Sequence, residues 1–300
     1  MDETATTPSA NPADPYGLAP LWDALMEIYD AFAALATKHG WCWYLIAGNA
    51  LGVVRHDGDF VPWDDDLDMS MPRKYYEELR LVANRELPPH LRWVDYQNTA
   101  SYPYLFGKIM DVRPEAISRV EEAIHSRLPQ GLFVDIWPMD GVPTRFFSKA
   151  KRWVQRQALR LVMEYRTTNP PMSWKQVVRH PLPFLMAHAR PGLKTHKDFL
   201  YVMDAHARSL PMEKAEKTAH PFHRWYEQHG SYPARLWQEP LWAMFHGRLV
   251  PLPTDVHEHL RISLGEDYMT LPPPEKRHPT HDDFFEAPWK FGPDRYEKSE

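Results

Sequence analysis

The sequence predicts an α+β fold: a mixed sheet with flanking helices, followed by a mainly helical, proline-rich C-terminal part. Two observations predict it. Apolar residues at helical spacing alternate with short aromatic and aliphatic runs through the first half. In addition, 30 of the 300 residues are proline, about twice the usual share, and most lie in the second half. With 43% hydrophobic and 25% charged residues, the chain has an ordinary globular composition.

The first half is predicted element by element. Residues 1–19 are polar and rich in Ala, Thr and Pro, which indicates a disordered tail. Leu21, Leu25, Ile28, Phe32 and Leu35 recur at helical spacing, and Gly40 stands where a helix cap belongs. A turn and short helix over 48–55 and a helix over 73–86 follow. The predicted strands are 41–46, 64–71, 91–96, 104–110 and 132–137.

These elements divide the chain into three parts. Residues 1–19 form the tail, 20–145 the catalytic core, and 146–300 a C-terminal region that wraps the core. We expect the prolines of this last region to stiffen loops that carry Tyr268–Arg277 back to the functional site.

Charge and cysteine content exclude several classes. The net charge of −5 argues against nucleic acid as a partner. Cys42 is the only cysteine, so neither an internal disulfide nor a multi-cysteine zinc site can form, and a reducing compartment is expected. The sequence has no apolar run of about 18 residues and no signal peptide at its N-terminus. We therefore expect a cytoplasmic protein.

An acidic segment is the most informative feature. In a strand, Asp64, Asp66 and Asp68 would share one face, and a bound cation would offset the repulsion among their carboxylates. Mg²⁺, or Mn²⁺ in its place, prefers such oxygen ligands. The alternative is a charged surface turn.

Two further elements point in the same direction. Gly48 and Asn49 follow a predicted strand and begin a helix, where backbone N–H groups can approach a phosphate; the alternative is a tight structural turn. Asp135 interrupts an apolar strand, and burying its charge requires a metal or a partner such as a buried Arg. Together the three elements are typical of metal-dependent phosphoryl or nucleotidyl transfer.

Four sequence blocks resemble the LicD family, a branch of the nucleotidyltransferase fold that includes the fukutin-related proteins. They are AGNALGVVRH (47–56), FVPWDDDLD (60–68) with MPR (71–73), FVDIWPMDGVP (133–143), and LGEDYMTLPPPEKR (264–277). The resemblance implies a nucleotidyltransferase-like mixed sheet. It also implies transfer of phosphocholine, or in relatives a phospho-alditol, from a CDP-activated donor to a glycan. The metal-binding acids then fall on Asp66, Asp68 and Asp135, and the glycine turn on Gly48 and Asn49.

The chemistry suggests further roles. Arg55, Lys108 and Arg277 are candidates for a phosphate clamp, or else plain surface charges. Asp64 or Asp135 is the candidate proton acceptor. A choline head group would favour an aromatic cage, for which the candidates, otherwise core residues, are Trp63, Trp137 and Tyr268.

The remaining features carry weaker predictions. A zinc site at His278 and His281 is disfavoured by the intervening Pro279. Cys42 is expected to be an inert, buried thiol. The basic segment 149–160 is either a solvated helix face or a peripheral contact to the inner face of a membrane or a lipid-linked glycan acceptor.

Two other functions compete with the phosphotransferase. One is a nucleotidyltransferase that uses an NTP on a small acceptor, and the other is a catalytically silent scaffold in glycan assembly. The full set of acids argues against the scaffold. The sequence leaves the head group, the acceptor and the oligomeric state open.

Overall fold

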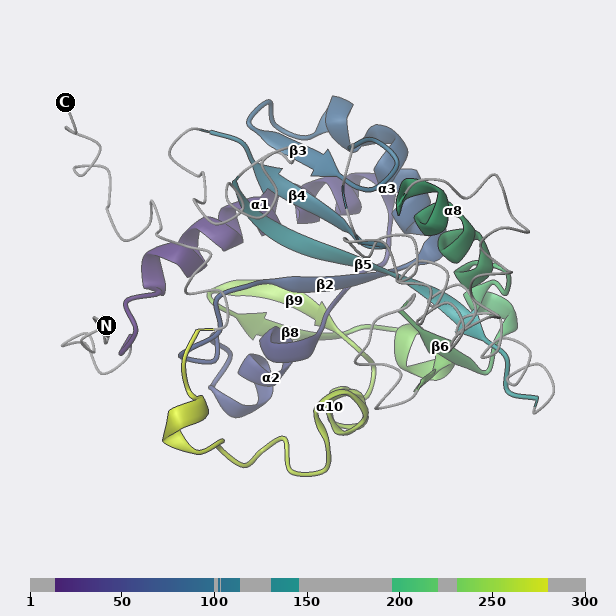
Figure 1. Ribbon diagram of the computed structural model, residues 1–300. Coiled ribbons are helices and arrows are strands. Elements are labelled where there is room, and N and C mark those ends of the chain that lie inside the picture. Colours follow the sequence, from purple (N-terminus) through teal and green to yellow (C-terminus); the bar gives the residue numbers. More distant parts are fainter. Residues whose placement is uncertain are drawn as a thin grey trace, which may run out of the picture.

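The computed structural model describes residues 14–99, 102, 104–113, 131–145, 196–220 and 231–279. It confirms the α+β class: a curled mixed sheet is covered by helices (Figure 1). The main path of the sheet, in spatial order, is β1 (Tyr44–Leu45), β2 (Asp68–Pro72), β5 (Leu132–Val142), β4 (Gly107–Asp111) and β3 (Leu91–Val94). Along this path only β2 and β5 run parallel, so β5 returns to lie between two strands made earlier.

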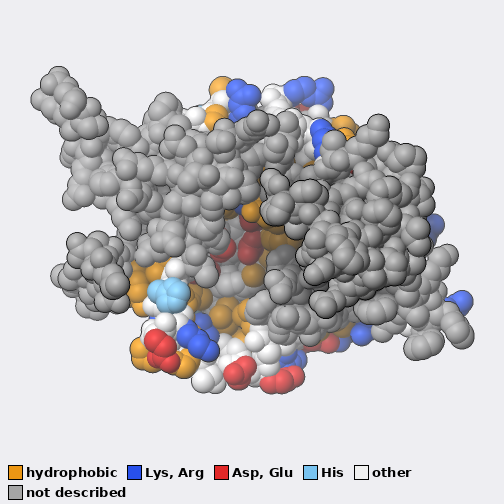
Figure 2. All heavy atoms as spheres, viewed as in Figure 1, with side chains coloured by type: hydrophobic (Ala, Val, Ile, Leu, Met, Phe, Trp, Pro, Cys, Tyr) orange, Lys and Arg blue, Asp and Glu red, His pale blue; other side chains and the backbone are white. Residues whose placement is uncertain are grey.

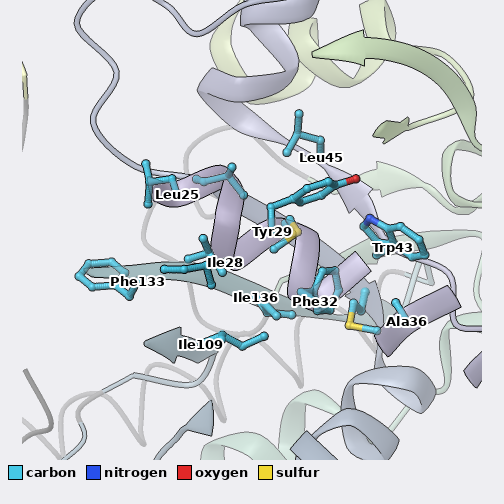
Figure 3. Close-up of a cluster of buried hydrophobic side chains, with 14 of the residues drawn as sticks. Leu25, Ile28, Tyr29, Phe32, Ala36, Trp43, Leu45, Ile109, Phe133 and Ile136 are labelled. Carbon is cyan, nitrogen blue, oxygen red and sulfur yellow. The ribbon is translucent and has the colours of Figure 1, made fainter. Parts of the chain in front are cut away.

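Two helices cover one face of this sheet, as their apolar spacing predicts. α1 (Ala19–His39) ends at Gly40, whose left-handed φ of 66° lets its N–H reach the carbonyls of the last turn. Its buried side chains gather against Ile109 and Ile136 of the sheet (Figure 3). α3 (Arg73–Glu86) packs against β2, β3 and β5. Both helices match the predicted segments closely.

Strand alternation separates the sheet into an apolar face and a polar face. Met69, Ile109 and Val134 belong to the buried core beneath the helices. Their sequence neighbours point the other way and form a polar row at matching register positions: Asp68, Lys108 and Asp135. One face therefore packs against the helices, whereas the other carries these charges together with a second apolar cluster that includes Tyr44 and Trp237.

Several predicted strand boundaries are wrong: β1, β3 and β4 are shorter than the predicted 41–46, 91–96 and 104–110, and β2 and β5 differ more. The strand predicted from residue 64 begins only at Asp68. The strand predicted to end at Trp137 continues through Pro138 to Val142. Pro138 is tolerated because β4 stops pairing at Ile136, so one side of β5 no longer needs a ladder donor there.

The C-terminal part holds strands as well as helices among its described residues. α8 (His196–Ala207) is followed by β6 (Lys217–Ala219) and β7 (Tyr232–Pro233), which extend the main sheet from β5. A hairpin of β8 (Leu241–Phe245) and β9 (Arg248–Leu252) turns at His246 and Gly247, both with positive φ. α10 (Val256–Leu264) comes next. Single turns of 3₁₀ helix lie at Met212–Lys214, Ala234–Trp237 and Pro274–Lys276.

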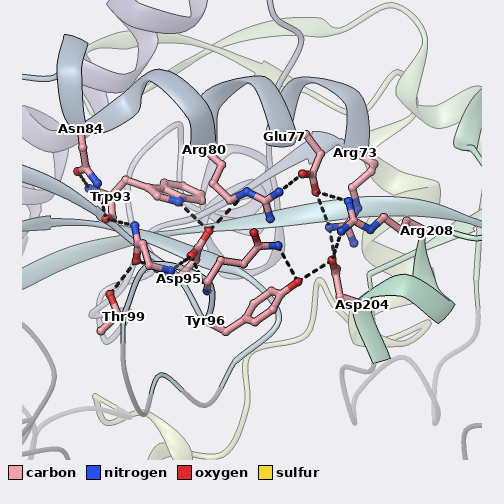
Figure 4. A network of polar contacts seen from close by, with 12 residues as sticks. Arg73, Glu77, Arg80, Asn84, Trp93, Asp95, Tyr96, Thr99, Asp204 and Arg208 are labelled. Carbon is pink, nitrogen blue, oxygen red and sulfur yellow. Dashed lines mark hydrogen bonds and ion pairs between the residues drawn. The ribbon is translucent and has the colours of Figure 1, made fainter. Parts of the chain in front are cut away.

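A buried ionic network fastens α8 to the core (Figure 4). Arg73 binds Asp140 of β5 with Nε 2.9 Å from Oδ1, and its Nη1 lies 2.9 Å from Oδ1 of Asp204 in α8. Tyr96 and Arg208 also bind Asp204. Burial opposes the charge of Arg73, but Asp140 and Asp204 outweigh it and raise its pKa. The network thus joins α3, β5 and α8 into one body.

None of the described helices is both long enough and apolar enough to cross a membrane.

Candidate active site

The centre of the site is a row of charges across three strands. Asp68 of β2 lies opposite Asp135 of β5, and Asp135 lies opposite Lys108 of β4. Because residues in register on neighbouring strands point to the same face, these three side chains stand side by side. Figure 2 shows acidic side chains at the floor of a hollow on this side of the molecule, among hydrophobic ones.

Lys108 is a buried partner of Asp135. Its Nζ lies 2.7 Å from Asp135 Oδ1, and only 6% of the residue is exposed. The same ammonium lies 3.2 Å from the centroid of the Phe133 ring. Of the two roles considered for Lys108, the plain surface charge is therefore excluded.

Asp64–Leu67 form a loop. In the predicted strand, Asp64, Asp66 and Asp68 would have shared one face, but only Asp68 lies in β2. Like charges on one strand face repel, so the chain instead turns at Asp64, whose N–H donates to the Val61 carbonyl. The indole of Trp22 in α1 donates to the Asp64 carbonyl at 2.8 Å and fixes the loop from outside.

Asn49 holds the same loop from inside. Its side chain is fully buried in α2 (Ala47–Arg55). The amide nitrogen donates to the carbonyl oxygen of Asp66 at 3.0 Å and to Oδ2 of Asp64 at 3.3 Å. Its oxygen accepts from the N–H of Asp68 at 2.7 Å. These contacts involve the Asn49 side chain only, so the predicted approach of a phosphate to the backbone N–H groups of this turn stays a prediction.

The turn into α2 is shaped for close approach. Ala47 takes a left-handed φ of 52°, which is strained for a residue with a side chain. At Gly48, an added Cβ would stand 2.5 Å from Asp64 Oδ2. Glycine is therefore required for the helix start and the Asp64 carboxylate to meet.

The acids raise one another's pKa. Burial raises the pKa of Asp68 well above its usual value, and Asp66 and Asp135 add to the rise, against the Trp137 indole and Lys108. Burial likewise raises the pKa of Asp64, reinforced by Asp66, Asp65 and Asp68. This is the electrostatic signature of a site that is short of positive charge.

The donor set fits a hard divalent cation. Asp64, Asp66, Asp68 and Asp135 supply only carboxylate oxygens, and their mutual repulsion is what an added cation would relieve. Within the described ranges, no three carboxylate, imidazole or thiol groups stand as a preformed metal centre. Asp135 is engaged with Lys108, and the Trp137 indole donates to Asp68 Oδ1 at 2.8 Å.

A cationic group lies beside the acids. Arg55, at the end of α2, donates to the carbonyl of Tyr268 at 2.7 Å and to that of Thr270 at 3.3 Å. Burial lowers the pKa of Arg55, Arg277 lowers it further, and Asp64 opposes this, so both charges lie near Arg55. The guanidinium of Arg277 lies 6.0 Å from the Trp63 ring centroid. The structure thus brings the C-terminal segment to the acidic loop.

Each of the three candidate cage residues packs against other side chains. Trp137 stacks on Phe106, with ring centroids 3.8 Å apart, and Phe106 stacks on Tyr104. Trp63 contacts Arg277 and the ring of His56, while the hydroxyl of Tyr268 lies 2.6 Å from His257 Nδ1. Each ring already has a neighbour of its own.

The weaker predictions have mixed outcomes. Cys42 is half-buried and not fully buried as predicted. His278 Nδ1 lies 3.1 Å from the carbonyl oxygen of Pro279. His281, the basic segment 149–160 and the tail up to residue 13 lie outside the described residues.

Sequence reasoning missed two contributors. Phe133 shares a strand face with Asp135 and covers the Lys108 ammonium; its period-two spacing from Asp135 was the available signal. Ser70, two residues after Asp68, lies 2.8 Å from Nε2 of His220. No local motif indicates His220, which directly follows β6 and lies far from Ser70 in the sequence.

Comparison with known proteins shows which family the chain is similar to. Residues 40–184 match the family model described as LicD/FKTN/FKRP, nucleotidyltransferase domain. This match includes the segment from β1 through the acidic loop to β5, and it confirms the predicted family resemblance. Among curated proteins, the chain is similar to the lipopolysaccharide cholinephosphotransferase LicD of Haemophilus influenzae. The two are 26% identical over 274 residues, which cover 85% of this chain and 92% of the relative.

Proposed function

We propose that the protein is a LicD-type phosphotransferase that moves a phosphocholine or phospho-alditol group from a CDP-activated donor to a glycan or cell-surface polysaccharide. One observation carries the proposal: the Asp68–Asp135–Lys108 row lies within a LicD-type domain. The relative's name adds phosphocholine transfer to lipopolysaccharide, which favours phosphocholine as the group moved.

In the proposed reaction, a hydroxyl oxygen of the acceptor bonds to the phosphorus of the head-group phosphate. The bond from that phosphorus to the bridging oxygen breaks, and CMP leaves with the bond's electron pair. Asp66, Asp68 and Asp135 would hold Mg²⁺. The ion supplies charge neutralisation for the pyrophosphate when it is bound.

The protein's own groups have separate tasks. Arg55 and Arg277 supply positive charge next to Asp64 and suit the donor's phosphates. The acceptor proton has two candidate bases, and we favour Asp64. Asp135 is ion-paired with Lys108 and is one of the proposed metal ligands, whereas Asp64 is outside the proposed metal set.

A binding screen separates this function from its competitors. Thermal unfolding is measured with CDP-choline, CDP-ethanolamine, CDP-ribitol, CDP-glycerol, CTP and ATP, each with and without Mg²⁺. Stabilisation by one of the CDP-linked donors that requires Mg²⁺ supports the proposal. Stabilisation by CTP or ATP alone favours a nucleotidyltransferase, and no response to any nucleotide favours the scaffold.

Turnover of the preferred donor tests the acids. Asp66→Ala combined with Asp68→Ala should abolish CMP release, while Asp57→Asn, in the exposed part of the preceding loop, should leave it unchanged. Full CMP release by the double variant in the presence of Mg²⁺ would show that the metal assignment is wrong.

A cytoplasmic location, with the acceptor presented at the inner face of a membrane, is part of the same proposal.

A further inference from the structure

The buried Lys108 raises a question that the reaction alone does not answer. A buried ammonium is costly unless it is paired, and Lys108 is paired twice, with Asp135 Oδ1 at 2.7 Å and with the Phe133 ring at 3.2 Å. The Phe106 ring lies 5.4 Å away on another side. Asp135 and the two rings thus form a cation-binding site that is filled by the protein's own Lys108 ammonium.

The same carboxylate is one of the proposed metal ligands. Asp135 raises the pKa of Asp68 and Lys108 lowers it, so one ammonium already offsets part of the charge of the cluster. A divalent cation between Asp68 and Asp135 would face that ammonium across a single carboxylate. Two cations so close repel strongly in a partly buried site.

We propose that Lys108 is an exchangeable counter-ion. Its ammonium neutralises Asp135 before the divalent cation binds, and the Lys108 side chain then moves so that the ammonium pairs with a phosphate of the donor. This inference rests on the proposed function. Lysine suits the task because its compact charge sits on a flexible four-carbon stem with three rotatable donors. The Phe133 ring gives the ammonium a second partner that remains when Asp135 turns away.

Exchange has a consequence for binding that a permanent ion pair does not have. The cation must displace the ammonium, so Lys108 weakens cation binding in the absence of donor. Phosphate gives the displaced ammonium a new partner, so donor and cation should bind more tightly together than either does alone.

The test measures direct binding of Mn²⁺ at pH 8, with electron paramagnetic resonance reporting the concentration of the free ion. Lys108→Met removes the charge but keeps an unbranched apolar stem, and Lys108→Arg keeps the charge. We expect Lys108→Met to bind Mn²⁺ roughly ten- to a hundredfold more tightly than wild type, from the loss of one nearby positive charge. Lys108→Arg should stay within about threefold of wild type. Lys38→Met, at an exposed pair with Glu86, is the matched control.

CDP should distinguish the variants a second time. Adding it should tighten Mn²⁺ binding in wild type and much less in Lys108→Met. Equal or weaker Mn²⁺ binding by Lys108→Met, with wild type binding normally, overturns the exchange and leaves the proposed function standing. A wild type that binds no Mn²⁺ at millimolar concentration overturns both.

A measurement on wild type alone guards against a variant that fails to fold. A crystal structure with Mn²⁺ and CDP should show Lys108 Nζ beyond hydrogen-bond distance of Asp135 and within it of a phosphate oxygen. An unchanged Lys108–Asp135 pair in that complex would overturn the proposal.

Discussion

Asn49 illustrates how one side chain can shape an acidic site. Its amide uses both ends, donating to Asp64 and Asp66 and accepting from the N–H of Asp68. These contacts hold the Asp64–Leu67 loop and the start of β2 in place despite the repulsion among the neighbouring carboxylates. An apolar replacement would leave buried polar groups without partners.

Asn49→Ala should therefore lower the free energy of unfolding by about 2–3 kcal/mol and lower Mn²⁺ affinity as the loop loosens. Urea unfolding followed by tryptophan fluorescence measures the first effect. Gln238→Ala, which removes an exposed amide, should change stability by less than about 0.5 kcal/mol. Equal stability of Asn49→Ala and wild type would contradict the assigned role.

His259 of α10 is a second residue with an unusual position. It is completely buried, its ring stacks on Tyr232 with centroids 5.0 Å apart, and among the described residues neither ring nitrogen has a hydrogen-bond partner. Burial lowers its pKa to about 3. The folded protein thus keeps this imidazole neutral.

This lowered pKa predicts acid sensitivity. Unfolded His259 takes up a proton near its usual pKa of about 6.5, so its contribution is complete above that pH and is lost as pH falls toward 3. His259→Leu should lose less stability than wild type between pH 7 and 4, by up to about 3 kcal/mol. Urea midpoints across that range measure the difference. His90→Gln, at a half-buried histidine, should follow the wild-type curve.

At the scale of elements, α8 depends on buried charges for its attachment. Asp204 is fully buried and receives Arg73, Arg208 and the Tyr96 hydroxyl. Removing one partner from a buried ionic network leaves the others desolvated and unpaired, which costs more than the loss of a surface pair.

Asp204→Ala should lower the free energy of unfolding by about 3–5 kcal/mol. The loss should be uneven, because α8 loses its anchor while the sheet keeps its own ladder. Hydrogen exchange should therefore speed up over 196–207 before it does over β4 and β5. Glu258→Ala, which breaks the exposed pair with Arg235, should cost under about 1 kcal/mol. Uniform acceleration across the whole chain would refute local detachment.

The elements also show what the sequence could and could not predict. Helical spacing located α1 and α3 because each buries one continuous apolar face. Period-two alternation misplaced the start of β2, since it ignores repulsion among Asp64, Asp66 and Asp68. The β8–β9 hairpin was missed although His246-Gly247 is a turn signal between apolar runs.

The site was predictable in part for a related reason. The sequence blocks indicate Asp68 and Asp135 as candidate site residues. The strand order of the sheet, which the sequence does not show, places the two residues opposite each other and pairs Lys108 with Asp135. Contacts such as His220 with Ser70 join residues 150 positions apart. No local pattern encodes those contacts.

At the scale of the whole molecule, residues from opposite parts of the chain meet at one place. Arg55 follows the first strand, whereas the Tyr268 carbonyl that receives it lies 213 residues later. Arg277 adds its charge from beyond that point. The C-terminal segment that includes Tyr268 and Arg277 therefore lies beside Arg55 at the candidate site.

Arg277→Ala should raise the KM for the donor roughly ten- to a hundredfold, as expected for one charged contact to phosphate, with little change in thermal stability. Arg55→Ala should act similarly, and the double variant should lose less than the product of the two effects because both groups serve one ligand. Steady-state kinetics of the three variants gives the coupling. Lys276→Ala, an exposed neighbour, should behave as wild type. Strict additivity would mean that the two arginines act independently.

The place of β5 between β2 and β4 has a consequence for how the protein is made. When translation has reached residue 113, the residues of β2 and β4 have both been synthesised, but β5, which lies between them in the sheet, has not. Asp68 and Lys108 emerge before Asp135, and Arg277 emerges last of all. Because Leu132–Val142 is made after both of its neighbouring strands, the row of Asp68, Asp135 and Lys108 cannot assemble until β5 has been synthesised.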